Sequence, residues 1–313
     1  GSPMPKPAKN NLLSFTLSPP LPANSGAPIY ITNTLIPLAE KYNLHLFTIG
    51  GQDEVEHIKK HQDLYVRYFD SIHVEPRAQM PSQKGLGGRV VHSLVHFYYG
   101  LPFVDASYYS FSAVQNARKI IKKYNIQAME IHSSHLAFFK KFMPNVPALL
   151  VSHNIESDIF PFWVPQGLSG WKKAAVELVA KASRWNAHQV EIDNKWKFEA
   201  MTFISMNDMV RVSDEVKKSY IPLCLPIKEM EYSDKPSQYI NLLWMGGFWW
   251  HPNAEGVLWF IRSILPLIRH KLSGLNIRLH FLGAAPPDEL KAVDDGKNIF
   301  VHGFVESLED MLD

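Results

Sequence analysis

Cysteine, long apolar runs and an excess of one charge are all missing from this sequence. Cys224 is the only cysteine in 313 residues, which excludes an internal disulfide, and no Cys/His spacing matches a zinc site. A reducing compartment fits such a chain best. Because Cys224 stands among Ile, Pro and Leu residues, we expect it to be a small buried side chain.

Membrane-spanning and nucleic-acid-binding classes are also disfavoured. No run of about 18 apolar residues occurs, so no membrane-spanning helix is predicted. Lys and Arg total 32 and Asp and Glu total 30, for a net charge of +2. Proteins that bind nucleic acid by neutralising its phosphates are usually strongly basic, so this balance of charge predicts that the chain does not bind nucleic acid. The hydrophobic content of 46% is typical of a globular protein of about two domains.

The first residues bear on location. Gly1 to Pro3 read as an expression remnant ahead of Met4, and no secretory signal follows Met4. The predicted location is cytoplasmic, and the inner face of the membrane is left open as a second location.

The first two thirds of the chain alternate short apolar strands with helical segments. Such alternation predicts an α/β fold with a mainly parallel sheet covered on both faces, and ligands at the carboxyl ends of its strands. A long amphipathic helix is marked by apolar residues at helical spacing, which are Trp171, Ala175, Leu178, Ala182 and Trp185. The predicted strands are 11–17, 44–49, a weaker one within 64–74, 127–132, 148–152 and 201–205; the other predicted helices include 29–41 and 207–220.

A second α/β unit is predicted near the end. The segment 222–238 carries three prolines and is predicted to be a linker. Strands at 240–245, 277–282 and 298–302 follow, each ending at or near a glycine. We expect an N-terminal Rossmann-like domain at 4–221 and a second Rossmann-like domain beginning at 239. Its three strands are fewer than the five or six usual for a mononucleotide unit, which predicts that 239–313 is a truncated portion.

The stretch LLWMGGFWWHPNAEGVLWFIRSILPLIR, residues 242–269, resembles the opening of the donor domain in retaining glycosyltransferases of family four. LHFLGAAPP (279–287) and IFVHGFVESLEDML (299–312) are similar to the next two blocks of that family. In the first half, PPLPANSGAPIYITNTLIPLA (19–39), VSHNIES (151–157) and FISMNDM (203–209) resemble its cleft loop, its His-Asn-x-Glu turn and the block before its linker.

The resemblance implies the glycosyltransferase B fold and sugar transfer from a nucleotide-diphosphate sugar, with retention of configuration. The acceptor would be a glycan, a lipid-linked molecule or a protein, as in polysaccharide biosynthesis. No covalent nucleophile, cofactor or metal is expected. The alternative is a non-catalytic scaffold of the same fold that binds an acceptor or a partner enzyme.

Candidate donor-binding residues follow from the need to stabilise a diphosphate. Backbone N–H groups at glycine turns before helices can do this. Gly26 lies in one such turn, and Gly246 and Gly247 form another. Glycine could equally serve only to allow the turn. The resemblance adds Phe304 and Val305 as residues that meet the nucleobase, with core packing as the alternative.

His153 is the candidate catalytic residue, because the matching histidine of the family lies near the donor sugar and its phosphates. It could donate a hydrogen bond or carry a charge near neutral pH. A loop histidine bonded to a carbonyl is the alternative. Asn154 and Glu156 are predicted to order its loop. Asp208 could accept a proton but favours a helix cap.

Several family features are absent or ambiguous. Residues 248–253 carry no Arg or Lys, where many relatives place a basic diphosphate clamp, and His251 could replace it only in part. Trp249 could stack on a sugar or an acceptor, or close the face of the next helix. The aromatic stretch 97–111 could contact an acceptor or a membrane surface peripherally, with packing as the alternative.

Overall fold

The computed structural model describes residues 9–23, 26–77, 85–159, 169–225 and 238–305. The chain divides into two compact units, 1–227 and 228–313. The predicted boundaries at 4–221, 222–238 and 239–313 stay a prediction, and residues 226–237 of the predicted linker lie outside the described residues. Within the described residues, no helix is long and apolar enough to cross a membrane.

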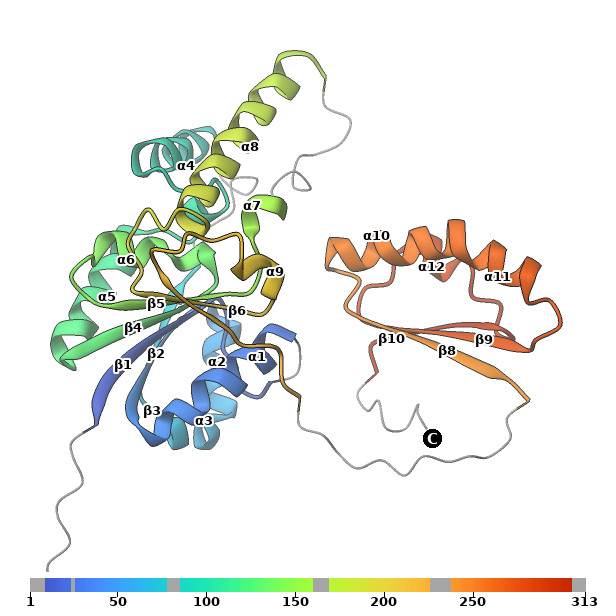
Figure 1. Cartoon of the computed structure of the whole chain (residues 1–313), viewed down its shortest axis with the longest axis horizontal. Coiled ribbons are helices and arrows are strands. Elements are labelled where there is room, and N and C mark those ends of the chain that lie inside the picture. Colours follow the sequence, from blue (N-terminus) through green and yellow to red (C-terminus); the bar gives the residue numbers. More distant parts are fainter. Residues whose placement is uncertain (1–8, 24–25, 78–84, 160–168, 226–237, 306–313) are drawn as a thin grey trace, which may run out of the picture. The chain divides into compact units, whose positions relative to one another are not determined.

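Seven parallel strands form the sheet of unit 1, in the order β3-β2-β1-β4-β5-β6-β7 (Figure 1). The chain order reverses between β1 and β4. In sheets of this kind, ligands bind beyond the carboxyl ends of the strands at such a switch point. The strands are β1 (Asn10–Thr16), β2 (Tyr42–Gly50), β3 (Phe69–Pro76), β4 (Ile126–His132), β5 (Ala148–Ser152), β6 (Ala200–Phe203) and β7 (Lys217–Tyr220).

Helices cover both faces of this sheet, as predicted from the apolar strands. Leu13 packs into a core with α5 and α6, while Leu12 packs into a second core with α1, α2 and α3. Successive residues of β1 are therefore buried on opposite faces. The helices are α1 (Gly26–Leu35), α2 (Gln52–Lys60), α3 (Gln62–Tyr68), α4 (Leu86–Tyr99), α5 (Phe111–Lys123), α6 (Phe138–Phe142), α7 (Glu156–Ile159), α8 (Gly170–Glu191) and α9 (Met206–Met209), with 3₁₀ turns η1 (Ile36–Glu40), η3 (Asp105–Ser107) and η4 (Ser134–Leu136).

Two local predictions for unit 1 are wrong, and the helix predicted at 29–41 is correct only in part. The helix predicted at 207–220 is only the single turn α9, and its last residues form the edge strand β7, which pairs with β6. The helix predicted at 29–41 changes to a 3₁₀ turn at Ile36, next to Pro37, whose missing N–H cannot continue the α-helical bonding. Cys224 is exposed rather than buried.

Unit 2 contains three parallel strands in the order β10-β9-β8, with its helices on one face (Figure 1). Val257, Phe281 and Ile299 are central in the core between sheet and helices. On the opposite face Met245 is 55% exposed, and no described helix covers it. The elements are β8 (Ile240–Met245), α10 (His251–Trp259), the π-helical segment η6 (Phe260–Ile264), α11 (Leu265–Lys271), β9 (Ile277–Leu282), α12 (Asp288–Lys291) and β10 (Ile299–Gly303).

A close backbone approach fixes the glycine turn after β8. The Gly246 N–H donates to the Leu282 carbonyl at 3.0 Å, and the Phe248 N–H donates to the Ala284 carbonyl at 2.9 Å. A Cβ atom on Gly283 would overlap the carbonyl oxygen of Gly246. Gly283 is therefore a glycine because the turn carrying Gly246 and Gly247 lies against it.

We predict that Gly283→Ala destabilises unit 2 by about 3 kcal/mol, since the new Cβ must displace backbone rather than a side chain. Gly274→Ala is the matched control, because a Cβ at Gly274 meets nothing within 4 Å. Urea unfolding followed by tryptophan fluorescence measures both. Equal unfolding midpoints for the two variants would contradict the close approach of β9 to the β8 turn.

Candidate functional site

Polar residues gather where β4 and β5 end, next to the switch point of the sheet in unit 1. His132 is the last residue of β4, and His153 directly follows β5. Ser133 adopts φ +81° and ψ 135°, a conformation that non-glycine residues rarely adopt and that is often found at functional sites. The carboxyl edge of the sheet therefore carries both histidines and a strained turn.

His153 is packed between two rings. Its ring centroid lies 5.8 Å from that of His132 and 5.3 Å from that of Tyr30, and both contacts are edge-on. Tyr30 belongs to α1, and its hydroxyl donates to the Ile221 carbonyl at 2.9 Å. Through Tyr30, the first helix of the chain is placed against the loop that carries His153.

Burial, with a smaller contribution from the neighbouring His132, lowers the pKa of His153 to about 3. The imidazole is therefore neutral at neutral pH, which leaves hydrogen bonding rather than a positive charge as its role. Its Nε2 atom is buried and has no hydrogen-bond partner in the described part of the chain. The packing of the fold thus makes no use of this nitrogen.

Glu130 joins the two strands at the switch point. It is 3% exposed and accepts a hydrogen bond from the Ser14 hydroxyl of β1 at 3.2 Å. The Nε2 atom of His132, two residues along the same face of β4, lies 3.5 Å from a Glu130 carboxylate oxygen. A carboxylate is therefore buried directly beneath the histidine pair.

A second group of ionisable side chains, the carboxylate–histidine cluster, consists of Asp105, His135, Glu156 and Glu191. His135 Nδ1 lies 2.5 Å from Asp105, and its Nε2 lies 3.5 Å from Glu156. Burial alone would lower the pKa of His135, but the charge and hydrogen bond of Asp105 outweigh burial and raise it to about 9. His135 is therefore an imidazolium at neutral pH, in contrast to His153.

Glu191, at the end of α8, binds the loops after β4 and β5 together. It accepts hydrogen bonds from the Ser134 hydroxyl at 2.6 Å, the Glu156 N–H at 2.9 Å and the Ser157 N–H at 3.0 Å. Burial raises the pKa of Glu191 to about 7, although these bonds act in the opposite direction. The carboxylate–histidine cluster is thus part of the same sheet edge as His153.

The structure places the other predicted residues of unit 1 near this edge to different extents. Gly26 is the first residue of α1, and a Cβ there would meet nothing within 4 Å; Asn24 and Ser25 of the same predicted turn lie outside the described residues. Asn154 is exposed, whereas Glu156 is buried in the cluster. Asp208 follows the cap Ser205 and lies 3.8 Å from Arg211, which binds Asp158 of α7.

The predicted donor residues of unit 2 lie after β8 and β10. The Gly247 carbonyl accepts a hydrogen bond from Asn253 at 3.0 Å. Trp249 is 72% exposed, and its indole lies over Gly247. His251 begins α10 and lies 4.0 Å from Glu255, with both side chains largely in solvent.

Phe304 and Val305 follow β10. Phe304 is 74% exposed. Val305 is partly buried. Both residues stand at the carboxyl edge of the sheet of unit 2, as do the residues after β8.

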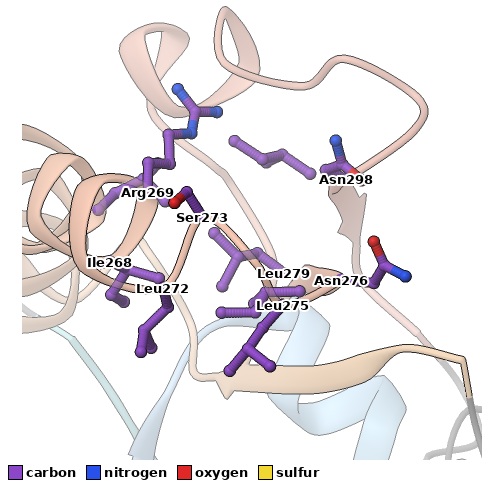
Figure 2. Close-up of a pocket in the computed structure, with 11 residues that line it drawn as sticks. Ile268, Arg269, Leu272, Ser273, Leu275, Asn276, Leu279 and Asn298 are labelled. Atoms are coloured by element: carbon purple, nitrogen blue, oxygen red, sulfur yellow. The ribbon is translucent and has the colours of Figure 1, made fainter.

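Pockets lie near both sheets. One, of about 350 Å³, is at the carboxyl ends of β1 and β2 and is lined by Pro19, Asp53, Glu54 and His57 among others. Another, of about 280 Å³, is lined mostly by apolar side chains of α11 and its following loop (Figure 2). Because it includes Ile277 and Ile299, the first residues of β9 and β10, this pocket lies at the amino ends of the strands. Ligands of such sheets bind at the carboxyl ends. Among the described residues, no group of three or more His, Cys, Asp or Glu could hold a metal ion.

Sequence reasoning did not find Tyr30, His132, His135 or Glu191 as members of this edge. His132 did carry a signal, because it ends a predicted apolar strand, as the strand before His153 does. His135 carried no such sequence signal, because its main partner Asp105 is 30 residues away in the chain.

Comparison with known proteins identifies the fold. No family model matches the chain, and no curated protein matches it. The crystal structure of TarM aligns with 97% of this chain and 78% of its own, at 8% identity and a TM-score of 0.55. The structure of Medicago truncatula UGT71G1 with UDP-glucose aligns with 97% of this chain and 74% of its own, at 12% identity and a TM-score of 0.48. The structure of S. aureus MnaA with UDP aligns with 95% of this chain and 70% of its own, at 10% identity and a TM-score of 0.46.

The likeness to TarM is strong enough to show a shared fold and, at such low identity, shows the fold alone. The predicted class, α/β with the Rossmann-like glycosyltransferase B type of fold, is confirmed. The TM-scores of UGT71G1 and MnaA are below 0.5 and support no conclusion about this chain.

The low pKa of His153 makes a prediction about acid stability. The folded pKa of about 3 lies below the ordinary value of about 6.5, so the unfolded chain binds this proton first as the pH falls. Stability is therefore lost from about pH 6.5 downward. Between pH 7 and 5 we expect the wild type to lose about 2 kcal/mol more than His153→Phe, which keeps the ring contact with Tyr30.

Urea unfolding at the two pH values measures this difference. His188→Phe is the control, since His188 is 46% exposed on α8 and should lose stability as the wild type does. Equal losses in wild type and His153→Phe would mean that His153 already titrates normally in the folded protein.

Proposed function

We propose that the chain acts as a glycosyltransferase that moves a sugar from a nucleotide-diphosphate sugar to an acceptor hydroxyl, with retention of configuration. One observation carries the proposal: the switch-point edge of the sheet in unit 1 brings a neutral, partly buried histidine with a buried Nε2 atom against the first helix. Ligands gather at this edge in doubly wound sheets, and His153 has a ring nitrogen that the fold leaves without a partner.

The chemistry assigns separate roles to the two units. When the bond to the donor phosphate breaks, negative charge develops on the diphosphate. In this proposal the N-terminus of α1 at Gly26 and the Gly247 N–H of the turn after β8 bind the diphosphate, because such backbone N–H groups stabilise anions without a metal. The Gly246 N–H already donates to the Leu282 carbonyl, so Gly246 serves the turn itself. His153, being neutral, donates a hydrogen bond to the sugar or its phosphate. The leaving phosphate oxygen takes the proton of the acceptor hydroxyl on the same face of the sugar.

Unit 2 is proposed to be the nucleotide-sugar donor domain. Trp249 and Phe304 are exposed aromatic side chains beyond the ends of β8 and β10, where a base or a sugar could stack on them. The uncovered face of its sheet, including Met245, supports pairing with further structure beyond the described residues, because parallel sheets are normally buried on both faces.

Unit 1 is proposed to bind the acceptor. The pocket lined by Asp53 and His57 at the ends of β1 and β2 offers a carboxylate and an imidazole to hydroxyl groups. This arrangement supports a hydroxyl-rich acceptor such as a glycan, and thereby a place in polysaccharide biosynthesis. Lipid-linked and protein acceptors are the other members of the proposed class.

Thermal unfolding with a panel of UDP-, GDP- and ADP-sugars tests the proposal. A ligand that binds only the folded chain raises the Tm by mass action, and a ligand at about 100 times its Kd contributes about 2.7 kcal/mol. We expect a rise with one nucleotide class that His153→Phe reduces and His188→Phe leaves unchanged. If no nucleotide sugar moves the Tm of the folded wild type, the transferase proposal fails.

The second candidate is a non-catalytic scaffold of the same fold that binds an acceptor or a partner enzyme. It is favoured by residues 248–253, which hold no Arg or Lys to clamp a diphosphate, and by the exposed His251, a weak substitute. A scaffold predicts a rise in Tm with glycans and none with nucleotide sugars.

A further inference from the structure

Two helices of unit 1 expose a stripe of large apolar side chains. In α4 the buried side chains are His92 and His96, at 2% and 0% exposure. In α8 the residues that face the protein are mostly small, among them Ser183, Ala187 and Val190. A surface helix normally turns its largest apolar side chains inward, so the outward stripes of both helices need a reason.

The exposed stripes are made of large side chains. In α8, Trp171, Leu178 and Trp185 recur every seven residues, which is about two helical turns and places them on one face. The sequence pattern correctly marked a long amphipathic helix, but this stripe points away from the core. The stripe residues of both helices, each between 52% and 82% exposed, are Val90, Val91, Leu94, Phe97, Tyr98, Trp171, Leu178 and Trp185; together they are called the α4–α8 apolar surface.

The two helices are held as one unit by the segment between α4 and η3. His92 contacts the Phe103 carbonyl at 2.8 Å, and the Phe103 N–H donates to the Ser183 hydroxyl of α8 at 3.0 Å. His96 contacts the Leu101 carbonyl, which also accepts from Asn186 of α8 at 3.4 Å. Figure 1 shows α4 beside α8 at one end of unit 1, with the first turns of α8 projecting from it. The contacts of the buried His92 and His96 therefore hold α4 with its apolar stripe facing outward.

The charge around the α4–α8 apolar surface is mainly positive. The sequence has no Asp or Glu from residue 77 to 104, nor from 159 to 176, and the exposed Glu177 of α8 lies 3.9 Å from Lys173. Lys172, Lys181 and Arg184 are exposed on α8, and the Lys172 ammonium lies 5.9 Å from the centre of the Trp171 ring. Helices that lie in a membrane interface carry tryptophan and leucine on one face and basic side chains next to that face.

We propose that the α4–α8 apolar surface docks on an anionic lipid membrane. The aromatic and aliphatic side chains would enter the boundary between headgroups and acyl chains, and the lysines would remain among anionic headgroups, each attracted to them. A second copy of the chain fits less well, since a two-fold interface would bring the same acid-free stretches face to face. This inference does not depend on the proposed transferase activity.

Co-sedimentation with vesicles tests the proposal. The intact chain is mixed with vesicles of phosphatidylcholine plus phosphatidylglycerol, or of phosphatidylcholine alone. We expect binding to the anionic vesicles that is about tenfold or more weakened without phosphatidylglycerol or in high salt. The docking variant, Leu94→Gln with Phe97→Gln, Trp171→Gln and Trp185→Gln, should lose the binding. All four side chains are exposed, so it should keep the wild-type melting curve.

A control variant carries similar changes at exposed apolar side chains elsewhere: Val66→Gln, Phe111→Gln, Trp259→Gln and Leu267→Gln, at residues 51% to 72% exposed. It should bind vesicles as the wild type does. The proposal is overturned if the wild type stays in the supernatant with both vesicle types, or if the docking variant binds as well as the control. It is also overturned if, without lipid, the wild type is a dimer that the docking variant abolishes.

Discussion

One buried carboxylate holds the functional edge of unit 1 together. Glu191 receives hydrogen bonds from Ser134 in the loop after β4 and from the N–H groups of Glu156 and Ser157 in the loop after β5. These loops lie beyond the ends of the strands, where regular strand pairing no longer fixes the backbone. Because Glu191 comes from the last turn of α8, the longest helix of unit 1 is tied to the ends of two central strands. Leaving three buried donors without an acceptor would be costly, which is why the loops stay where Glu191 holds them.

This constraint places two histidines of the same sheet edge in opposite electrostatic surroundings. His135 meets Asp105 and Glu156, and its pKa is raised to about 9. His153 meets the rings of Tyr30 and His132 instead, and burial lowers its pKa to about 3. The same edge therefore offers a fixed positive charge in its interior and a neutral hydrogen-bonding ring next to α1.

The sequence was enough to predict the layers of the fold but not the contacts of the site. Apolar strands such as β1 and β5 are buried on both faces, so their pattern predicted a parallel sheet and its carboxyl edge. Strand β7 was missed because it is an exposed edge strand with lysines, whose pattern resembles that of a helix surface. Among candidate residues, His153 could be found because it follows an apolar strand. Asp105 and His135 meet only through the fold. The apolar stripe of α8 is a further example. The spacing of its residues predicted that they share one face of the helix, but not whether that face is buried or exposed.

The most direct test of this account is the titration of the His153 imidazole by NMR, in the wild type and in two variants of α8. We expect His153 to stay neutral in the folded wild type down to about pH 5, and its pKa to move toward the ordinary value of about 6.5 in Glu191→Leu. Glu177→Leu changes an exposed carboxylate of the same helix and should leave the titration unchanged. A His153 that protonates near pH 6.5 in the wild type, or that titrates identically in Glu191→Leu, would contradict the claim that Glu191 organises this edge.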